Sequence, residues 1–535
     1  MRRREMDILY AEGSDRKYVQ LPEETLKDLA IDEIVHHFST IQEEKSILRN
    51  VMGQLPENTE DILFRQQILL DLMKYPELQK ELYSSLTNIR TMRDFFGARK
   101  ALADKDNALY SLLSDLRTLS LYVNTTKFLY ETLSKYELSS EGLHRLRNEL
   151  KAITETEEFQ VAGDDIDTML NDLSAVQSAV IGVNFTSDLT IDEVVAVEFR
   201  PYPTRSRYRF SNIAAAISTI TVSGQGAQHV GMAQVKSMKY NDPVLIALAP
   251  KLEKQFKGHI SAMKQIMIKY TKLDAHFITD MYEGLIFYLA SARFASYLKD
   301  HGYEYCMPQI ENTDVHYLEI QNFYNLRLAI RGAKEIVKND FTFKEDERLF
   351  ILTGPNRGGK TILEQGLGLI SLMASIGLFV TAGSCKGMPF RNILTHFPID
   401  ENLTMNYGRL GEEAKRVRDI LQDTDDRTLV LFNETYSTTS STDGLYLSLD
   451  LLHILKEKGA AVIFNTHIHD LAKNTETMNA WEGKSQVVSL VMEIINNVNT
   501  FKVKRSAPDT TSYARNIAMK YGITYEQMKE SSAST

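Results

Sequence analysis

Cysteine is scarce in this chain: of its 535 residues, only Cys306 and Cys385 are cysteines. They lack the spacing of metal ligands, and so low a content suits a reducing compartment. No apolar run approaches the roughly 20 residues that a membrane-spanning helix needs. The first residues, MRRREMDILYAEG, lack the apolar core and small-residue cleavage site of a secretory signal. We therefore expect a cytoplasmic protein with no membrane partner.

A positive net charge is also lacking. The chain has 61 lysines and arginines against 71 aspartates and glutamates, a net charge of −10. Any contact with nucleic acid must therefore come from a local basic patch rather than from the whole surface. With 43% hydrophobic and 25% charged residues, the composition is that of a globular protein. The length suggests roughly three domains of about 150 residues each.

Helix formers dominate the first third of the chain, and a small β-rich region follows it. RQQILLDLMKYPELQKELYSSL (65–86) has apolar residues at spacings of three and four, which predicts a helix. SAVIGVNF (178–185) and EVVAVEF (193–199) are short and β-branched, which predicts strands. AISTITVSG (216–224) is predicted to be a third strand.

Apolar residues return at alternating steps of four and three after Pro250, a pattern typical of a coiled-coil seam. One helix from Pro250 to about Lys299 would span roughly 75 Å at 1.5 Å per residue. Two long helical segments on either side of a β-rich piece predict a lever with that piece at its tip. From about residue 345 onward, short strands, turns and helices predict an α/β domain.

These patterns predict four regions. They are a helical core with a first lever segment (1–170), a β-rich tip (171–245), a second long lever helix that returns to the core (246–340), and an α/β domain (341–535).

A predicted buried strand, RLFILT (348–353), leads into the pattern G-x-x-x-x-G-K-T and then into a helical run. Strand, glycine-rich loop and helix in this order predict a P-loop. Glycines let backbone N–H groups approach phosphate oxygens, the lysine meets the β- and γ-phosphates, and the threonine hydroxyl can ligate Mg²⁺. The candidate nucleotide-binding residues are Gly354, Pro355, Asn356, Arg357, Gly358, Gly359, Lys360 and Thr361.

A second predicted strand, TLVLF (428–432), ends in Asn433 and Glu434. P-loop ATPases usually have aspartate at the first of these positions, where it helps to hold Mg²⁺. Asn433 supplies an oxygen without a charge, so with Thr361 it is a candidate nucleotide and metal residue that holds the ion less firmly. Glu434 is a candidate general base. A third strand places His467 where it could contact the γ-phosphate or the attacking water.

These stretches resemble the MutS family of DNA mismatch-repair ATPases over about residues 345–525. The resemblance rests on TGPNRGGKT (353–361), on NETYSTTSSTDGLYLSLDLL (433–452) and on IFNTHIHDLA (463–472). TTSYARNIAMKYGI (510–523) is similar to the segment that supports dimerisation in that family. The resemblance implies an ABC-type α/β P-loop ATPase domain, preceded by a mainly α-helical core and lever domain with a clamp-like insertion. It also implies ATP and Mg²⁺ as cofactors, a homodimer, and double-stranded DNA, mismatched or branched, as partner.

The sequence departs from the family pattern at particular places. Core-like helices begin almost at once, so the resemblance implies a shortened member without the N-terminal mismatch-reading domain. Gly408 stands where the family has a serine that reaches the partner's ATP, although Arg409 beside it offers a cation. Together with Asn433, this departure predicts slow ATP hydrolysis.

RPYPTRSRYRF (200–210) contains four arginines, two tyrosines and no acid, beside the predicted tip strands. Arginines bind phosphates, which makes Arg205, Arg207 and Arg209 candidate DNA contacts; a solvated loop is the other interpretation.

Three hypotheses for function stay open. The first is a MutS-like DNA-binding ATPase that acts as a dimeric clamp in mismatch or damage repair or in recombination. The second is a nucleotide-gated module that hardly hydrolyses ATP and binds branched DNA or another large assembly. The third, a transporter-class ATPase, is disfavoured because its signature serine–glycine pair and a membrane segment are lacking.

Overall fold

The structure is a computed structural model, and its described residues fall into two compact units. The first unit contains those within 84–135 and 146–280, and the second those within 7–83, 136–145 and 281–535. The described residues are 7–101, 108–173, 178–188, 190–200, 202, 254, 257–270, 276–398, 409–437, 439–483, 485–496, 498–507, 521–527 and 529. The predicted strand 216–224, Arg205, Arg207, Arg209, Gly408 and most of 510–523 lie outside them.

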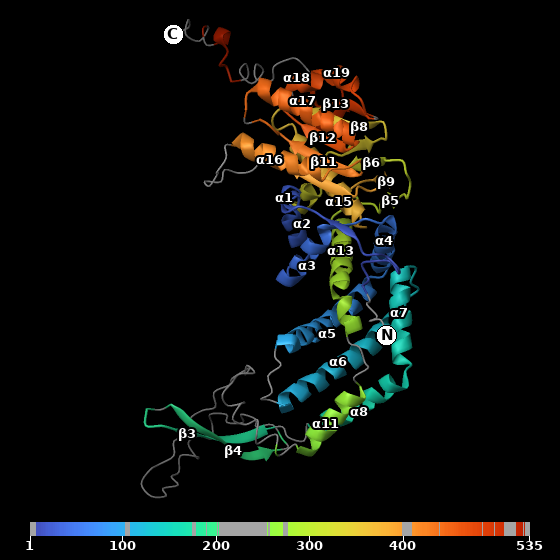
Figure 1. The fold of residues 1–535 in the computed structure, drawn as a ribbon, viewed down its shortest axis with the longest axis vertical. Helices are drawn as coiled ribbons and strands as arrows, with labels where there is room; N and C mark the ends of the chain where they lie inside the picture. The colour runs from blue at the N-terminus through green and yellow to red at the C-terminus, as the bar shows by residue number, and fades with distance from the viewer. Residues whose placement is uncertain are drawn as a thin grey trace. The chain divides into compact units, whose positions relative to one another are not determined.

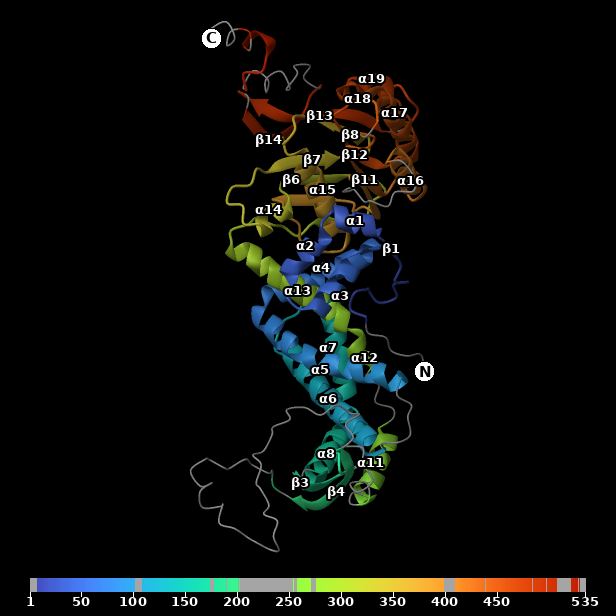
Figure 2. The ribbon, with the colours of Figure 1, turned by 90° about the vertical axis from the view of Figure 1, so that its left-hand side faces the viewer.

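In the first unit, three helices pack against one another, and two strands form an antiparallel hairpin (Figures 1 and 2). The helices are α6 (Ala108–Ser134), α8 (Glu157–Leu173) and α11 (Lys257–Lys269), and the strands are β3 (Ser178–Phe185) and β4 (Ile191–Arg200). Both strands lie where β-branched residues predicted them, so those two predictions are confirmed. Tyr122 of α6 and Phe159 of α8 meet edge to face, at 6.1 Å between ring centroids.

The periodicity of 250–299 predicted one uninterrupted helix, and this prediction is wrong for the described part of the segment. It contains α11, then α12 (His276–Asp280) and α13 (Tyr282–Asp300), with a turn at Met281. At the end of α11, Lys269 Nζ and Tyr270 Oη both bind Asp165 of α8, at 2.7 and 2.5 Å. These contacts tie the helix end to α8. Spacing predicted the buried face, which includes Met263 and Tyr270, but it carries no information on where a helix stops.

The second unit begins with short helices that pack around α13. Phe38 of α2 stacks on Phe294 of α13, with ring centroids 4.4 Å apart. The elements here are β1 (Tyr18–Gln20), α1 (Glu23–Asp28), α2 (Ile31–Phe38), α3 (Gln42–Met52), β2 (Gln54–Pro56) and α4 (Thr59–Lys74). Residues of α5 (Pro76–Ala101) and α7 (Glu141–Thr154) are divided between the two units.

Two sheets follow in the second unit. The smaller has the strand order β5-β9-β6-β7, and the larger has the order β10-β11-β12-β8-β13-β14. In the larger sheet β10, β11, β12, β8 and β13 run parallel, and β14 pairs antiparallel at the edge. The strands are β5 (Gln309–Ile310), β6 (Leu318–Phe323), β7 (Asn339–Phe343), β8 (Glu347–Thr353), β9 (Ser384–Gly387), β10 (Asn392–His396), β11 (Thr428–Asn433), β12 (Ala461–Asn465), β13 (Gln486–Ile495) and β14 (Val498–Arg505).

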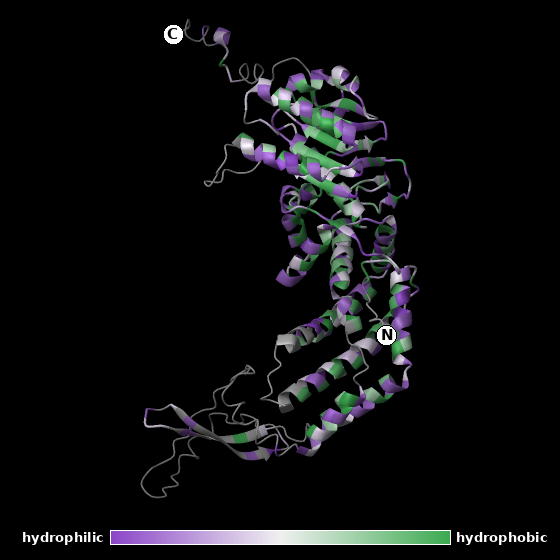
Figure 3. Cartoon of the chain, viewed as in Figure 1, coloured by the Kyte–Doolittle hydropathy of each residue, from purple (hydrophilic) through white to green (hydrophobic). Residues whose placement is uncertain are grey.

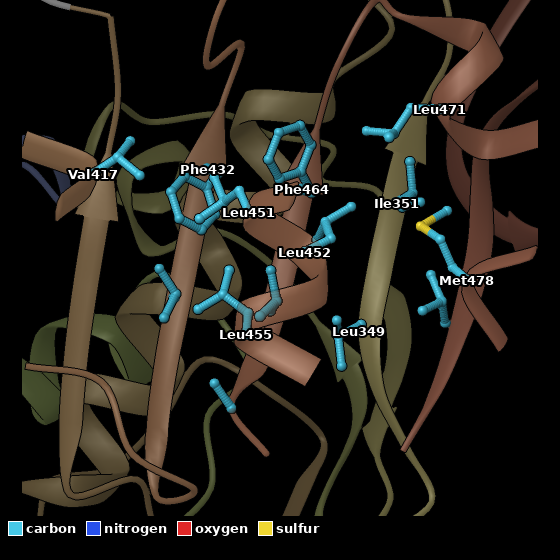
Figure 4. Close-up of a cluster of buried hydrophobic side chains, with 14 of the residues drawn as sticks. Leu349, Ile351, Val417, Phe432, Leu451, Leu452, Leu455, Phe464, Leu471 and Met478 are labelled. Carbon is cyan, nitrogen blue, oxygen red and sulfur yellow. The ribbon is translucent and has the colours of Figure 1, made fainter. Parts of the chain in front are cut away.

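Helices cover the parallel sheet because its strands are apolar on both faces. Successive residues of a strand point to opposite faces. Phe432 of β11 therefore packs with Leu451 and Leu452 of α17 (Figure 4). Leu431 points to the opposite face, toward Gly368 of α15. Figure 3 shows hydrophobic residues gathered in these strands. The helices are α14 (Leu326–Ile330), α15 (Lys360–Ser375), α16 (Arg409–Gln422), α17 (Ser441–Lys458), α18 (His469–Lys473) and α19 (Thr475–Asn479).

The parallel strands bring the carboxyl ends of β8, β11 and β12 to one edge of the sheet. Asn433 is the register partner of Asn465, which in turn pairs with Leu352. In open α/β sheets, ligands bind outside such an edge. Within the described ranges, none of the helices combines the length and apolar character needed to span a bilayer.

Candidate functional site

A glycine-rich loop connects the end of β8 to the start of α15, as the sequence predicted. Gly354 has φ +143° and Gly359 has φ +93°, values that favour glycine. A Cβ at Gly354 would lie 2.9 Å from the Cβ of Met492 in β13, so the strand next to the loop also demands glycine. Gly359 directly precedes α15, and the first turn of the helix therefore presents its free N–H groups at the loop.

Lys360 is the first residue of α15, and its side chain folds back into the loop. Its Nζ donates to the carbonyl oxygens of Gly354 and Pro355, at 3.1 and 3.2 Å. Only 5% of the residue is exposed. Burial lowers the pKa of Lys360, while the nearby carboxyls of Glu434 and Glu364 oppose that shift. The ammonium thus donates to neutral carbonyl oxygens, and an anion in the loop would accept stronger hydrogen bonds from it.

Thr361 and Asn433 meet at the base of the loop. The Thr361 hydroxyl donates to Oδ1 of Asn433 at 3.4 Å, and Asn465 Nδ2 donates to the same oxygen at 2.8 Å. The two predicted metal residues are therefore neighbours, and the amide oxygen of Asn433 faces Thr361. Both oxygens are of the hard type that Mg²⁺ prefers.

Glu434 and His467 form a close pair beside this cluster. His467 Nε2 and Glu434 Oε1 are 2.7 Å apart, and about a third of each side chain is exposed. The hydrogen bond to His467 lowers the pKa of Glu434; burial opposes this, and the charge of Lys360 adds to it. Glu434 is therefore ionised at neutral pH, the form that a general base needs. The structure brings together two predicted residues that are 33 positions apart.

A cavity of about 470 Å³ opens beside the loop. Its wall combines loop residues with side chains that sequence analysis did not predict, among them Tyr324, Val337 and Phe501. Phe501 of β14 is 46% exposed, and its ring lies 3.1 Å from where a Cβ of Gly359 would stand. No local motif marks Phe501, because a hairpin formed far along the chain brings it to the loop.

Two buried polar residues behind Asn433 were also missed. Glu364 and Asn465 are both 0% exposed, and Asn465 Nδ2 donates to Glu364 Oε2 at 3.2 Å. Burial raises the pKa of Glu364 well above its usual range. Both residues could have been predicted from the sequence. Glu364 follows Thr361 by three positions, which puts both on one helix face. Asn465 ends the strand that precedes His467.

Some predicted residues are not placed at this site. Arg205, Arg207 and Arg209 lie outside the described residues, as does Gly408. Arg409, next to Gly408, is the first residue of α16.

Comparison with known proteins finds similarity in the part of the chain that contains this site. Residues 350–533 match the family model of MutS domain V. A DNA mismatch repair protein MutS of Lactobacillus delbrueckii subsp. bulgaricus is 34% identical over 151 residues, which is 28% of this chain and 18% of that protein. An endonuclease MutS2 of Acetivibrio thermocellus is 31% identical over 27% of this chain and 18% of its own length. An endonuclease MutS2 of Staphylococcus epidermidis is 28% identical over 43% of this chain and 30% of its own length. The matches thus cover less than a third of each relative.

Proposed function

Because residues 350–533 carry MutS domain V and make this chain a member of the MutS family, we propose that it is a DNA-binding ATPase. ATP binding at the 354–361 loop would set how the protein holds DNA. One observation carries the proposal: Lys360, the Thr361–Asn433 pair and the Glu434–His467 pair converge at one edge of the sheet. DNA affinity measured with and without ATP tests it.

The loop would hold the phosphates of ATP. Backbone N–H groups of residues 354–361 and the positive end of α15 would face the phosphate oxygens. Lys360 would leave the carbonyls of Gly354 and Pro355 for the β- and γ-phosphates. The adjoining cavity has the volume typical of small-molecule sites, so it offers space for the base and ribose.

Phe501 would stack on the base. Phe501→Ala is expected to weaken ATP binding roughly tenfold, because stacking of a base on an aromatic ring is worth about 1–3 kcal/mol. Titration with a fluorescent ATP analogue measures the change. Tyr446→Ala is the matched control, since this exposed aromatic lies on α17 outside the cavity wall. Equal ATP affinities of the Phe501→Ala and Tyr446→Ala proteins would show that Phe501 does not contact the base.

Thr361 and Asn433 would hold the Mg²⁺ ion that accompanies the nucleotide. The Thr361 hydroxyl and the Asn433 carbonyl oxygen fit a hard cation, and the phosphates would supply further oxygens. Among the described residues, no three histidine, cysteine, aspartate or glutamate side chains gather as a metal site, so the ion would depend on those phosphates. When bound, Mg²⁺ offsets the negative charge of the phosphates during phosphoryl transfer.

Glu434 would take the proton of the attacking water, and His467 would hold Glu434 in place and contact the γ-phosphate or the water. Asn433 lacks the charge that aspartate would add next to the ion. Hydrolysis is therefore proposed to be slow, leaving a long-lived ATP-bound state.

We propose a homodimer in which the regions preceding the ATPase domain enclose double-stranded DNA. The proposed regions are the helical core and first lever segment (1–170), the clamp-like tip (171–245), the second lever segment and return to the core (246–340), and the ATPase domain (341–535). Contacts with the DNA backbone would dominate, with mismatched or branched DNA as the preferred forms. The name of the Lactobacillus delbrueckii relative, a DNA mismatch repair protein, supports this substrate class.

Arg205, Arg207 and Arg209 are proposed to contact DNA phosphates at the clamp-like tip. Replacing all three with glutamine should weaken DNA binding and reduce the slope of log affinity against log salt by roughly 0.9 for each phosphate that is no longer neutralised. Fluorescence anisotropy over a salt series measures that slope. An unchanged slope would identify this segment as a solvated loop.

A second candidate function is a nucleotide-gated module for branched DNA or another large assembly that scarcely hydrolyses ATP. Asn433 favours it, because the missing charge affects turnover more than binding. The number of ATP molecules hydrolysed per site and per minute separates it from the first proposal.

A further inference from the structure

Three polar side chains are buried together beneath the loop. Asn433 is 5% exposed, and Asn465 and Glu364 are 0% exposed. Within the described part of the chain, Asn465 Oδ1 and Glu364 Oε1 have no hydrogen-bond partner. Buried polar atoms without partners cost stability. A cluster retained at such a cost points to a role other than packing.

Asparagine at a metal position poses a problem that aspartate does not. The two oxygens of an ionised aspartate are equivalent acceptors, whereas the asparagine amide has one oxygen and one NH₂ group of nearly the same shape. If the amide of Asn433 turned over, its NH₂ group would face Thr361 and would repel a cation. The site therefore needs a device that fixes the amide.

The contacts of Asn433 provide such a device. Asn465 Nδ2 donates to Asn433 Oδ1 at 2.8 Å, which the reversed amide could not accept. Asn465 lies opposite Asn433 because they are register partners in β11 and β12. The amide of Asn465 could itself turn over, but Glu364 Oε2 accepts its second N–H at 3.2 Å. Glu364 reaches this place from α15, the helix that also carries Thr361.

We propose that Asn465 and Glu364 are positioning residues that keep the carbonyl oxygen of Asn433 directed toward Thr361. In this arrangement an asparagine serves the Mg²⁺ of bound ATP in place of an aspartate. The inference rests on the proposed function, and it identifies two residues on which the dependence of ATP binding on Mg²⁺ relies.

The test is the ATP affinity in Mg²⁺ divided by the ATP affinity in EDTA. Both affinities are measured on the full chain with a fluorescent ATP analogue. Asn465→Ala should lower this ratio at least about tenfold, the usual cost of removing a partner behind a metal ligand. Affinity in EDTA should not change. Adding Asn433→Asp should restore the ratio, because either aspartate oxygen can face the ion. Rescue by this second change is not expected if Asn465 only supports the fold.

Asn479→Ala is the matched control, since Asn479 at the end of α19 binds the backbone of Val487 in β13, at 3.1 and 2.6 Å. Its ratio should equal that of the wild type. Thermal unfolding shows whether each variant folds. If Asn465→Ala does not fold, Glu364→Met replaces it, because methionine has no oxygen to accept the second N–H of Asn465 and should lower the ratio as well.

The outcomes separate the inference from the proposed function. A ratio equal to that of the wild type in the folded Asn465→Ala protein, or in Glu364→Met where that variant replaces it, overturns the inference and leaves the ATP site standing. A lowered ratio that Asn433→Asp does not restore also overturns it. A wild-type protein that binds no ATP, with or without Mg²⁺, overturns the proposed function and the inference with it.

Discussion

Lys360→Ala is expected to lower ATP affinity at least about tenfold, equivalent to about 1.4 kcal/mol. The ammonium is the cation that the first turn of α15 directs into the loop, and without it the β- and γ-phosphates lose their main positive partner. The fold should survive, because the side chain binds only two carbonyls and burial already disfavours its charge. Isothermal titration with ATP measures the change in affinity.

Lys456→Ala is a closely matched control for this change. Lys456 is also a buried lysine, and its Nζ donates to the carbonyl oxygens of Met478 and Trp481 at 2.8 and 2.9 Å. It lies on α17, away from the loop. Its replacement should lower stability but leave ATP affinity as in the wild type. A folded Lys360→Ala protein with unchanged ATP affinity would contradict the nucleotide site.

Glu434→Ala should reduce single-turnover ATP hydrolysis by about 10²- to 10⁴-fold, the usual contribution of a general base. Asn433→Asp should have the opposite effect. A gain of about 2–3 kcal/mol in stabilisation of the transition state would accelerate hydrolysis roughly 30- to 150-fold. The wild type is expected to hydrolyse well below about one ATP per second, since Asn433 lacks the negative charge that aspartate would supply.

Glu457→Ala controls for the removal of a glutamate paired with a histidine. Glu457 lies 3.7 Å from His453 on α17, outside the site, and its replacement should leave hydrolysis unchanged. Fast hydrolysis in the wild type, or an Asn433→Asp protein no faster than it, would show that Asn433 does not limit the rate.

The sequence predicted those parts of the site that depend on local patterns. β8, the glycine-rich loop and α15 follow one another in the chain, and each has its own pattern of residues. The pairing of Glu434 with His467 was also accessible, because both follow strands and the ends of parallel strands meet at one edge. The strands β3 and β4 were predicted for the same local reason.

Features that depend on packing between distant segments were not predicted. Phe501 reaches the loop through a hairpin that pairs with β8 only in the folded sheet. The contact between Asn465 and Glu364 depends on how closely α15 lies on the strands. The turn at Met281 separates α12 from α13, although the apolar pattern continues across it, so spacing alone predicted one helix here.

The most direct test of the central claim is the affinity of the purified full chain for homoduplex, mismatched and branched DNA, with and without MgATP. We expect ATP to change the affinity for at least one of these DNA forms in the wild type, and to leave all of them unchanged in the Lys360→Ala protein. DNA affinities that are the same with and without ATP in the wild type would contradict the claim that the loop controls DNA binding.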